Sequence, residues 1–435
     1  MDQSAEILEL LRKYESPNVT YLDPDGTWPI VWERARGCHV WDISGKKYLD
    51  LTAAFGVAVT GHANDAVVSA GHGQMDKLLH AMGDVHPHAL KAQLCRELSR
   101  WTFERWTSHL PNPVHGRTTL CNSGFEAVET ALKTAVMATG RPRILAFEGG
   151  YHGLGYGALN ATHRPMFRDP FLRQIGQFGD FVPFPQTPDQ AQDSLKIIRK
   201  HLESGQIGAI ILEPAQARGG LRFPPEGFLF QLRQITLEFQ SLLILDEIYT
   251  GFGRTGTWFA CESENVIPDL ICLGKALTGG FPMAACTGTS ASMQAAWPAS
   301  RGEAIHTSTF LGHPVGCAMA LAQLRELEDM DGAGEARKKG GILAAALESA
   351  FGGRPGMVIR GRGLMAGLEV MDGDGCPDGG RVIGVVKRAL EMGYIFLPCG
   401  ESGQVMSWTP GYVIGGDELE ESVAVVADLL GGAEG

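Results

Sequence analysis

Lys275 stands at the end of a short apolar segment, residues 270–273, where a lysine could take part in chemistry. A lysine at the end of a buried strand loses hydration, which lowers its pKa and favours the neutral amine that forms Schiff bases. A lysine whose charged end reaches from the strand into solvent would give the same pattern. Lys275 is therefore a candidate nucleophilic amine, with the solvated lysine as the alternative.

Asp246 follows a second apolar segment, residues 242–245. A carboxylate at the end of a buried strand needs a cationic or hydrogen-bonding partner. A protonated pyridine ring would be such a partner, and the ring proton is what makes a pyridine cofactor an electron sink. The alternative interpretation is a structural aspartate that caps the next turn.

The turn Ser123-Gly124 precedes a clear helical pattern over residues 125–133. A Ser-Gly turn at the start of a helix presents free N–H groups and the positive end of the helix dipole, which suits a phosphate. Ser123 as a plain N-cap would explain the same residues. This turn is the third candidate position.

The candidates belong to a series of short, continuously apolar segments that alternate with helical patterns. Such segments are typical of strands covered on both faces, and the alternation predicts an α/β fold with a mostly parallel, doubly wound sheet. The segments and the polar groups after them are 143–147 with Tyr151-His152, 209–212 with Glu213, 242–245 with Asp246, and 270–273 with Lys275. Because ligands bind beyond the carboxyl ends of the strands in such sheets, we expect a binding site at this edge.

The chain of 435 residues is long enough for more than one domain. Residues 1–60 are expected to form an N-terminal helix and strands that pack with the C-terminal part. Residues 61–312 would form a large ligand-binding domain. Residues 313–435, where the pattern changes, would form a smaller α+β domain.

Composition excludes several classes of partner. A formal net charge of −12 argues against nucleic acid and anionic membranes, and no segment reaches the roughly 20 apolar residues that span a bilayer. The nine cysteines contain no C-x-x-C pair, which is typical of reduced thiols and predicts a cytoplasmic protein. His86-Pro87-His88 has the spacing of metal ligands, but two histidines alone do not complete a site, so no metal site is expected.

The combination of motifs resembles the class III aminotransferases, also called the ornithine or ω-aminotransferase family, which are enzymes of fold type I. The matching blocks occur in the family's order and spacing along nearly the whole chain. They are 121–130, 150–153, 213–216, 246–256 (DEIYTGFGRTG), 268–285 (PDLICLGKALTGGFPMAA), 306–316 and 360–369. The resemblance implies pyridoxal 5′-phosphate as cofactor, an amine and a 2-oxo acid as substrates, a two-step ping-pong reaction, and a homodimer.

The resemblance also implies a role for each matching residue. Lys275 would form the Schiff base with the cofactor, and Asp246, supported by Glu213, would pair with the pyridine nitrogen. The remaining cofactor contacts would be Tyr151 stacked on the ring, Ile248 on its opposite face, His152 beside it, Tyr249 at the 3-hydroxyl, and Ser123, Gly124 and Phe125 around the phosphate. Thr309 would reach the cofactor phosphate in the neighbouring subunit.

Four positions depart from the family's pattern. Tyr249 stands where many members have Gln, and Phe125 replaces a small residue at the phosphate. Arg218 occupies a position where many members have Glu, while Ser407 aligns with an Arg that grips a substrate carboxylate. We expect either that Arg218 recognises an acidic substrate or that it is a solvated loop arginine. With Trp408 in the same wall, the donor could be an ω-amine or an amine without an α-carboxylate.

Other reactions are compatible with the same motifs. Relatives on this scaffold include decarboxylating transaminases and a semialdehyde aminomutase, and a non-catalytic relative that binds the cofactor is the alternative outside enzymes. The sequence leaves open the donor, whether pyruvate or 2-oxoglutarate is the acceptor, and assembly beyond a dimer.

Overall fold

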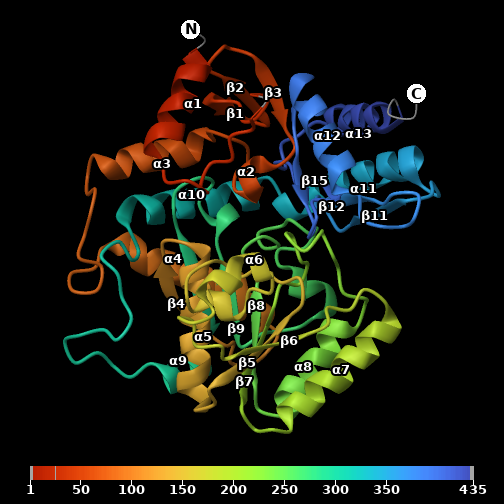
Figure 1. Cartoon of the computed structure of the whole chain (residues 1–435). Coiled ribbons are helices and arrows are strands. Elements are labelled where there is room, and N and C mark those ends of the chain that lie inside the picture. The colour runs from red at the N-terminus through yellow and green to blue at the C-terminus, as the bar shows by residue number, and fades with distance from the viewer. Residues whose placement is uncertain (1–2, 25, 432–435) are drawn as a thin grey trace.

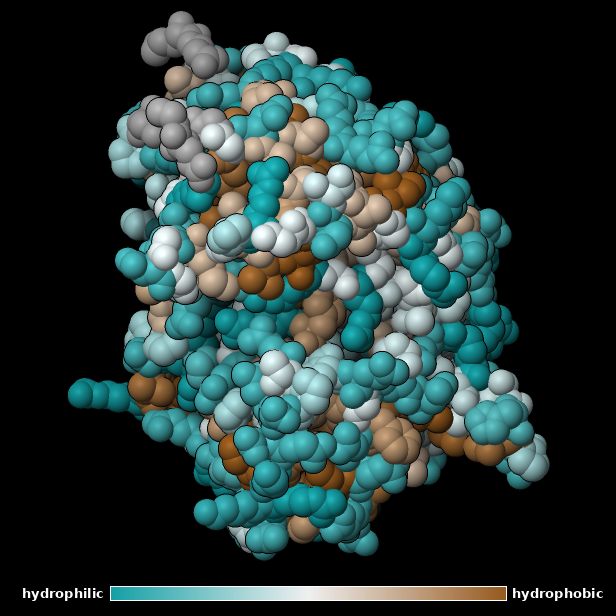
Figure 2. Space-filling model, turned by 90° about the vertical axis from the view of Figure 1, so that its right-hand side faces the viewer, coloured by the Kyte–Doolittle hydropathy of each residue, from teal (hydrophilic) through white to brown (hydrophobic). Residues whose placement is uncertain are grey.

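The computed structural model describes residues 3–24 and 26–431 and has an α/β architecture. A large sheet with helices on both faces fills the lower part of the molecule in Figure 1, and the N-terminal strands lie beside the C-terminal helices above it. Within the described ranges no helix is long and apolar enough to cross a membrane. Figure 2 shows a largely hydrophilic surface on one face, with hydrophobic side chains in small groups.

The large sheet has the strand order β4-β10-β9-β8-β7-β5-β6. Its strands are β4 (Gly116–Cys121), β5 (Arg143–Phe147), β6 (Gly179–Val182), β7 (Ile207–Leu212), β8 (Leu242–Asp246), β9 (Leu270–Leu273) and β10 (Ala284–Thr289). The four predicted strands are β5, β7, β8 and β9, and they pair in parallel. Strand β10 runs antiparallel to both β4 and β9. Only residues 274–283 separate β9 from β10, which is shorter than the dozen or more residues of a parallel crossover.

Both faces of the large sheet are buried, which explains why its strands are continuously apolar. Along β8, Leu243 and Leu245 belong to one core cluster and Ile244 to another. Because successive side chains of a strand point to opposite faces, each cluster covers one face of the sheet. The cluster that contains Ile244 also holds the inner side of α5 (Gly124–Thr139).

Two smaller sheets complete the fold. The first pairs the N-terminal strands β1 (Trp32–Arg36), β2 (His39–Asp42) and β3 (Lys47–Asp50) with β13 (Tyr394–Ile395). The second has the order β11-β12-β15-β14, with β11 (Met357–Gly361), β12 (Ala366–Val370), β14 (Leu397–Cys399) and β15 (Val405–Trp408). The pairing of β3 with β13 joins the N-terminal strands to the C-terminal part of the chain. The domain bounds given above stay a prediction.

The longer helices follow amphipathic segments of the sequence. They are α1 (Gln3–Tyr14), α3 (Asp65–Met75), α4 (Ala89–Ser99), α5, α7 (Pro188–Leu202), α8 (Phe228–Glu238), α10 (Pro314–Asp329), α11 (Gly332–Phe351), α12 (Gly379–Glu391) and α13 (Gly416–Gly431). Shorter ones are α2 (Ala53–Gly56), η1 (Arg100–Glu104), η2 (Ala158–Asn160), α6 (Pro165–Arg168), η3 (Asp169–Phe171), η4 (Ala260–Glu264), η5 (Lys275–Leu277) and α9 (Ser290–Ala296).

Candidate active site

The carboxyl ends of β5, β7, β8 and β9 open into a single cavity of about 1000 Å³. Its inner wall consists of the residues that follow these strands: Tyr151, His152, Glu213, Asp246, Ile248, Tyr249 and Lys275. Its outer wall consists of residues from loops and from the β14–β15 region: Arg164, Arg218, Leu397, Pro398, Cys399, Gly400, Ser407 and Thr409. The structure thus brings the predicted polar groups of four strands together.

Lys275 begins η5 directly beyond β9. Its φ of 43° lies in the left-handed region, which is uncommon for a residue with a side chain and is often found at functional sites. The Nζ atom lies 3.8 Å from the centre of the Tyr249 ring. Burial lowers the pKa of Lys275 to about 8; Asp246 opposes this shift, and the charge of Arg218 adds to it. The neutral amine is therefore a far larger share of Lys275 near neutral pH than it is of an exposed lysine, although the protonated form still predominates there.

Asp246 ends β8 and is held in place by two groups. Its Oδ2 lies 2.8 Å from Nδ1 of His152, and the N–H of Ile248 donates to its Oδ1 at 3.1 Å. Both side chains of the His152–Asp246 pair are buried. His152 Nε2 is buried too and has no hydrogen-bond partner in the described part of the chain.

Glu213, to which the family resemblance assigns a supporting role, makes no direct hydrogen bond to Asp246 in the described part of the chain. Its two oxygens accept the backbone N–H groups of Tyr151, at 2.9 Å, and Ala217, at 3.2 Å. Burial raises the pKa of Glu213 to about 7, and the negative charge of Asp246 adds to the shift. Two neighbouring carboxylates repel, so the imidazole of His152 takes the supporting position.

The amino end of α5 lines the cavity with Gly124 and Phe125. The Oγ of Ser123 is buried and has no partner within residues 3–24 and 26–431. Gly153, whose φ is 103°, packs against the first turn of α5. A Cβ on this residue would lie only 2.4 Å from the Cβ of Phe125. A Cβ on Gly124 would lie 3.0 Å from Ile248. The N-terminus of α5 therefore has glycine backbone packed closely around it and an unpaired hydroxyl, that of Ser123, beside it.

Two aromatic residues of the inner wall are fixed by contacts with other parts of the chain. The Tyr151 ring packs edge-on against Phe167, with 5.7 Å between ring centres. The phenol of Tyr249 is 3.0 Å from Oγ1 of Thr409, which joins the two walls. The family resemblance places this phenol at a hydroxyl of the cofactor. The hydroxyl of Thr409 would compete with the cofactor for the phenol's hydrogen bond.

Trp408 does not line the cavity, so its assignment to the substrate wall is wrong. Successive side chains of β15 alternate, and Ser407 faces the cavity while Trp408 points into the core. The indole N–H donates to Ser422, and the ring lies edge-on to Phe396 at 5.2 Å. Ser407 itself donates its hydroxyl to the backbone oxygen of Leu397.

Arg218 and Thr309 are both exposed, in different places. Arg218 lines the cavity, and its guanidinium carbon lies 4.6 Å from the centre of the Tyr151 ring. Thr309 lies in the segment between α9 and α10 and is outside the cavity residues of its own chain. Its contact with a neighbouring subunit's cofactor stays a prediction.

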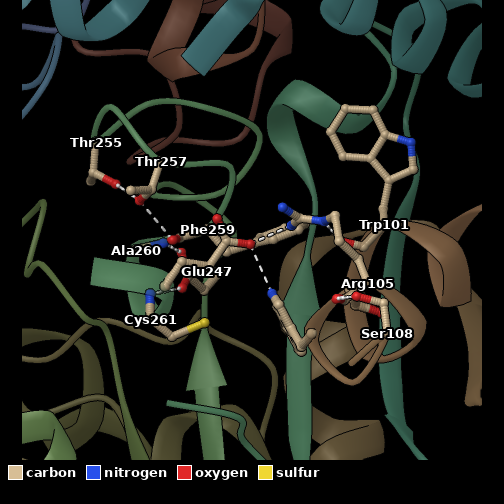
Figure 3. Close-up of polar contacts among 12 residues, drawn as sticks. Trp101, Arg105, Ser108, Glu247, Thr255, Thr257, Phe259, Ala260 and Cys261 are labelled. Carbon is tan, nitrogen blue, oxygen red and sulfur yellow. Dashed lines mark hydrogen bonds and ion pairs between the residues drawn. The ribbon is translucent and has the colours of Figure 1, made fainter. Parts of the chain in front are cut away.

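Glu247, the residue after Asp246, is buried on the other side of the same strand end. It accepts the backbone N–H groups of Ala260 and Cys261, each at 2.9 Å, and the hydroxyl of Thr250. Figure 3 shows Glu247 directed at Ala260 and Cys261. Burial raises the pKa of Glu247 to about 7. This acid ties the end of β8 to η4 from behind, which helps to keep Asp246 in position.

Comparison with known proteins identifies the family. The family Aminotransferase class-III matches residues 21–430. The chain is 35% identical to acetylornithine aminotransferase of Methanopyrus kandleri over 426 residues, 97% of this chain and 98% of the relative. It is 33% identical to 5-aminovalerate aminotransferase of Pseudomonas aeruginosa over 416 residues, 92% and 93% of the two chains. The chain belongs to the class III aminotransferases.

A solved structure of similar fold bears on the cofactor. An amine transaminase from an uncultivated Pseudomonas species, in its PLP-bound form, superposes with a TM-score of 0.85 at 25% identity, over 97% of this chain and 98% of the other. Class III aminotransferases depend on pyridoxal 5′-phosphate, and this aminotransferase does so as well.

The residues of the aminotransferase cavity fit this cofactor. The unpaired Ser123 hydroxyl and the N-terminus of α5 suit a phosphate. The pairing of Asp246 with His152 provides a fixed carboxylate for a ring nitrogen, and Lys275 provides an amine of lowered pKa. Arg164 and the hydrogen bond of His152 to Asp246 were missed from the sequence, because only the folded chain brings these residues to the cavity.

Proposed function

We propose that Lys275 is the lysine that binds the cofactor of this aminotransferase and that Asp246 pairs with the cofactor's ring nitrogen. The observation that carries the proposal is the position of the Lys275 amine in one cavity with the Asp246–His152 pair. Ser123, Gly124 and Phe125 would surround the phosphate. Tyr151 and Ile248, which both line the cavity, would contact the two faces of the ring.

When bound, pyridoxal phosphate draws electrons away from the carbon that carries the amino group. Asp246 would keep a proton on the ring nitrogen, since its carboxylate is fixed by His152 and by the N–H of Ile248. Lys275, once released by the incoming amine, would take a proton from the substrate carbon at Nζ and deliver it elsewhere on the bound molecule. Its lowered pKa suits a proton acceptor near neutral pH.

Donor and acceptor would use the cavity in turn, as a ping-pong reaction requires. The names of two relatives specify acetylornithine and 5-aminovalerate as substrates of those proteins. For this chain we propose an ω-amine or another amine without an α-carboxylate as donor and a 2-oxo acid as acceptor. Arg218 would contact the carboxylate of an acidic substrate, because Ser407 has no charge and its hydroxyl is bonded to Leu397.

We further propose a homodimer in the cytoplasm. Exposed large apolar side chains concentrate in two segments that are adjacent in space, since the rings of His80 and Phe310 are 5.2 Å apart. They are Met75, Leu78, Leu79, Met82, Val85, Ile305 and Phe310. An exposed apolar group of this kind is typical of a protein interface. The cysteines of the described chain are all free thiols, which supports a reducing compartment.

The test is a half-reaction with cofactor-loaded protein and single amines in the absence of an acceptor. The donors would be 4-aminobutyrate, 5-aminovalerate, ornithine, glutamate, alanine, an aromatic amine and an amino sugar, and the readout is the absorbance of the cofactor. Conversion of the cofactor to pyridoxamine phosphate by 4-aminobutyrate, 5-aminovalerate or another amine of the proposed class supports the proposal, whereas conversion by glutamate or alanine alone contradicts the proposed donor class. An absorbance that none of these amines changes contradicts the proposed donor class.

Further assays with the same cofactor-loaded protein separate the alternative reactions. Release of carbon dioxide during turnover would indicate a decarboxylating transaminase. Isomerisation of a substrate without any acceptor would indicate an aminomutase. A normal cofactor spectrum that no amine perturbs would indicate a relative that binds the cofactor without catalysis.

A further inference from the structure

The basic residues of the outer part of the cavity differ in their pairing. Three of them line it: Lys387, Arg164 and Arg218. Lys387 forms an ion pair with Asp23. Neither arginine has an ion pair with a carboxylate anywhere in residues 3–24 and 26–431; their contacts are with backbone oxygens and aromatic rings. No ion pair with a described residue therefore neutralises the positive charge of these two arginines.

Arg164 is anchored by one corner of its guanidinium. Its Nη2 donates to the backbone oxygens of Arg218, at 2.5 Å, and Gly400, at 2.6 Å. Its other N–H groups have no hydrogen-bond partner in the described ranges. Burial lowers the pKa of Arg164, and the charge of Arg218 lowers it further. Glu401 acts in the opposite direction, yet it is exposed and forms no ion pair with Arg164 in the described structure.

Arg218 is held at the base of its side chain and free at its end. The N–H of the preceding residue, Ala217, donates to Glu213, and the Arg218 backbone oxygen accepts from both Arg164 and Gly400. The guanidinium lies over the ring of Tyr151 and 6.0 Å from the centre of Phe167. A guanidinium stacked on a ring keeps its N–H edge available for a carboxylate.

The two guanidiniums raise each other's electrostatic energy, and a bound anion would relieve this repulsion. The cavity wall beside them is lined by Leu221, Leu397, Pro398 and Cys399, which suits a short carbon chain. Lys275, where the reaction is proposed to occur, lies in the same cavity, and the charge of Arg218 acts on its pKa.

We infer that Arg164 and Arg218 together form a subsite for a carboxylate at the end of the substrate remote from the carbon that exchanges its amino group. The inference rests on the proposed function and extends carboxylate recognition from Arg218 to Arg164. Because donor and acceptor enter the same cavity, the subsite selects a donor such as 5-aminovalerate and an acceptor such as 2-oxoglutarate.

The test compares matched substrates that differ only in the remote group. The donors are 5-aminovalerate and 1-aminopentane, and the acceptors are 2-oxoglutarate and 2-oxopentanoate. The wild-type enzyme is expected to prefer the member with the remote carboxylate in kcat/KM. Arg218→Ala and Arg164→Ala should each lower kcat/KM for that member by roughly 10- to 100-fold, the size of a lost hydrogen bond to a charged group. The uncharged member should change little.

Two further variants keep the result interpretable. Arg164→Lys retains the charge and should retain part of the preference, which covers the case in which Arg164→Ala does not fold. Arg173→Ala is the matched control, because Arg173 is exposed and lies outside the cavity residues. Thermal unfolding midpoints establish that each variant is folded.

A binding measurement separates this inference from the proposed reaction. Calorimetry with glutarate, a dicarboxylate that cannot react, should give a Kd about tenfold or more weaker for Arg218→Ala than for the wild type and Arg173→Ala, and a smaller weakening, of about threefold, for Arg164→Lys. Weaker glutarate binding in an enzyme that turns over none of the substrates would support the subsite and overturn the reaction. Equal glutarate binding by all folded variants, or a wild type that prefers neither matched member, would overturn the subsite.

Discussion

The inner and outer walls of the cavity are built in different ways. On the inner wall, the acids are held by the chain itself: Asp246 by His152, and Glu213 by two backbone N–H groups. On the outer wall, Arg164 and Arg218 bind backbone and rings but no acid of the described chain. Groups held at the ends of a rigid sheet are suited to chemistry that is the same for every substrate. Unpaired charges on loops are suited to choosing the substrate.

The largest expected effect is on the inner wall, at Lys275. Lys275→Ala removes the amine that we propose binds the cofactor and moves the proton, so turnover should fall by at least roughly 10³-fold with every substrate. Steady-state assays with several donors measure this. Lys196→Ala, at an exposed lysine on α7, is the control. Wild-type turnover by the Lys275 variant would contradict the assignment of the chemistry to the inner wall.

Asp246→Asn should have the next largest effect. The amide keeps the shape but not the charge that we propose holds a proton on the ring nitrogen, so kcat should fall by about 10²- to 10³-fold, as for a lost electrostatic contact in an active site. Donor preference should remain unchanged, because the outer wall is intact. Asp193→Asn, at an exposed aspartate, is the control. An altered order of donors with unchanged kcat would reverse the roles given to the two walls.

Trp408→Phe tests the boundary between the outer wall and the core. The substitution removes the hydrogen bond to Ser422 and part of a fully buried ring. The free energy of unfolding should fall by about 1–3 kcal/mol. The KM of each donor should stay as in the wild type, since the side chain does not reach the cavity. Denaturant unfolding and KM measurements check both statements; a changed KM with unchanged stability would return Trp408 to the substrate wall.

The smallest expected effect is a pH shift that connects the two walls. Lys275 attacks as the neutral amine, so the rate at which cofactor-free protein captures pyridoxal phosphate should rise with pH and level off above the lysine's pKa of about 8. The charge of Arg218 lowers this pKa. In Arg218→Ala the pKa should be higher, and the rate profile should move to higher pH. Rapid-mixing absorbance measures the profile, and an identical profile for both proteins would show that the walls are independent.

The inner wall could largely be predicted from the sequence, because its geometry follows from local rules. The apolar segments before Glu213, Asp246 and Lys275 form parallel strands, and parallel strands deliver their carboxyl ends to one edge. The helix after Ser123 begins where the Ser-Gly turn predicts. The partner of Asp246 could not be predicted. His152 is 94 residues away in sequence, and no local pattern predicts the direction of its ring.

The outer wall could be predicted only in part, since loops and register set it. The type of residue at Arg218 and Ser407 indicated a change in carboxylate recognition, but no periodic pattern placed Arg164 in the cavity. Trp408 was assigned to the wrong side because the strand β15 was not recognised in the sequence. Once the strand is known, alternation places Trp408 on the face opposite Ser407.

The central claim is that Lys275 is the residue that carries the cofactor, and chemical trapping tests it most directly. Borohydride reduction of cofactor-loaded protein fixes the cofactor on the amine that holds it, and mass spectrometry of the resulting peptides locates it. We expect the modification at Lys275, within the peptide that follows β9, and none in Lys275→Ala. Modification of a different lysine in the wild-type protein would contradict the account.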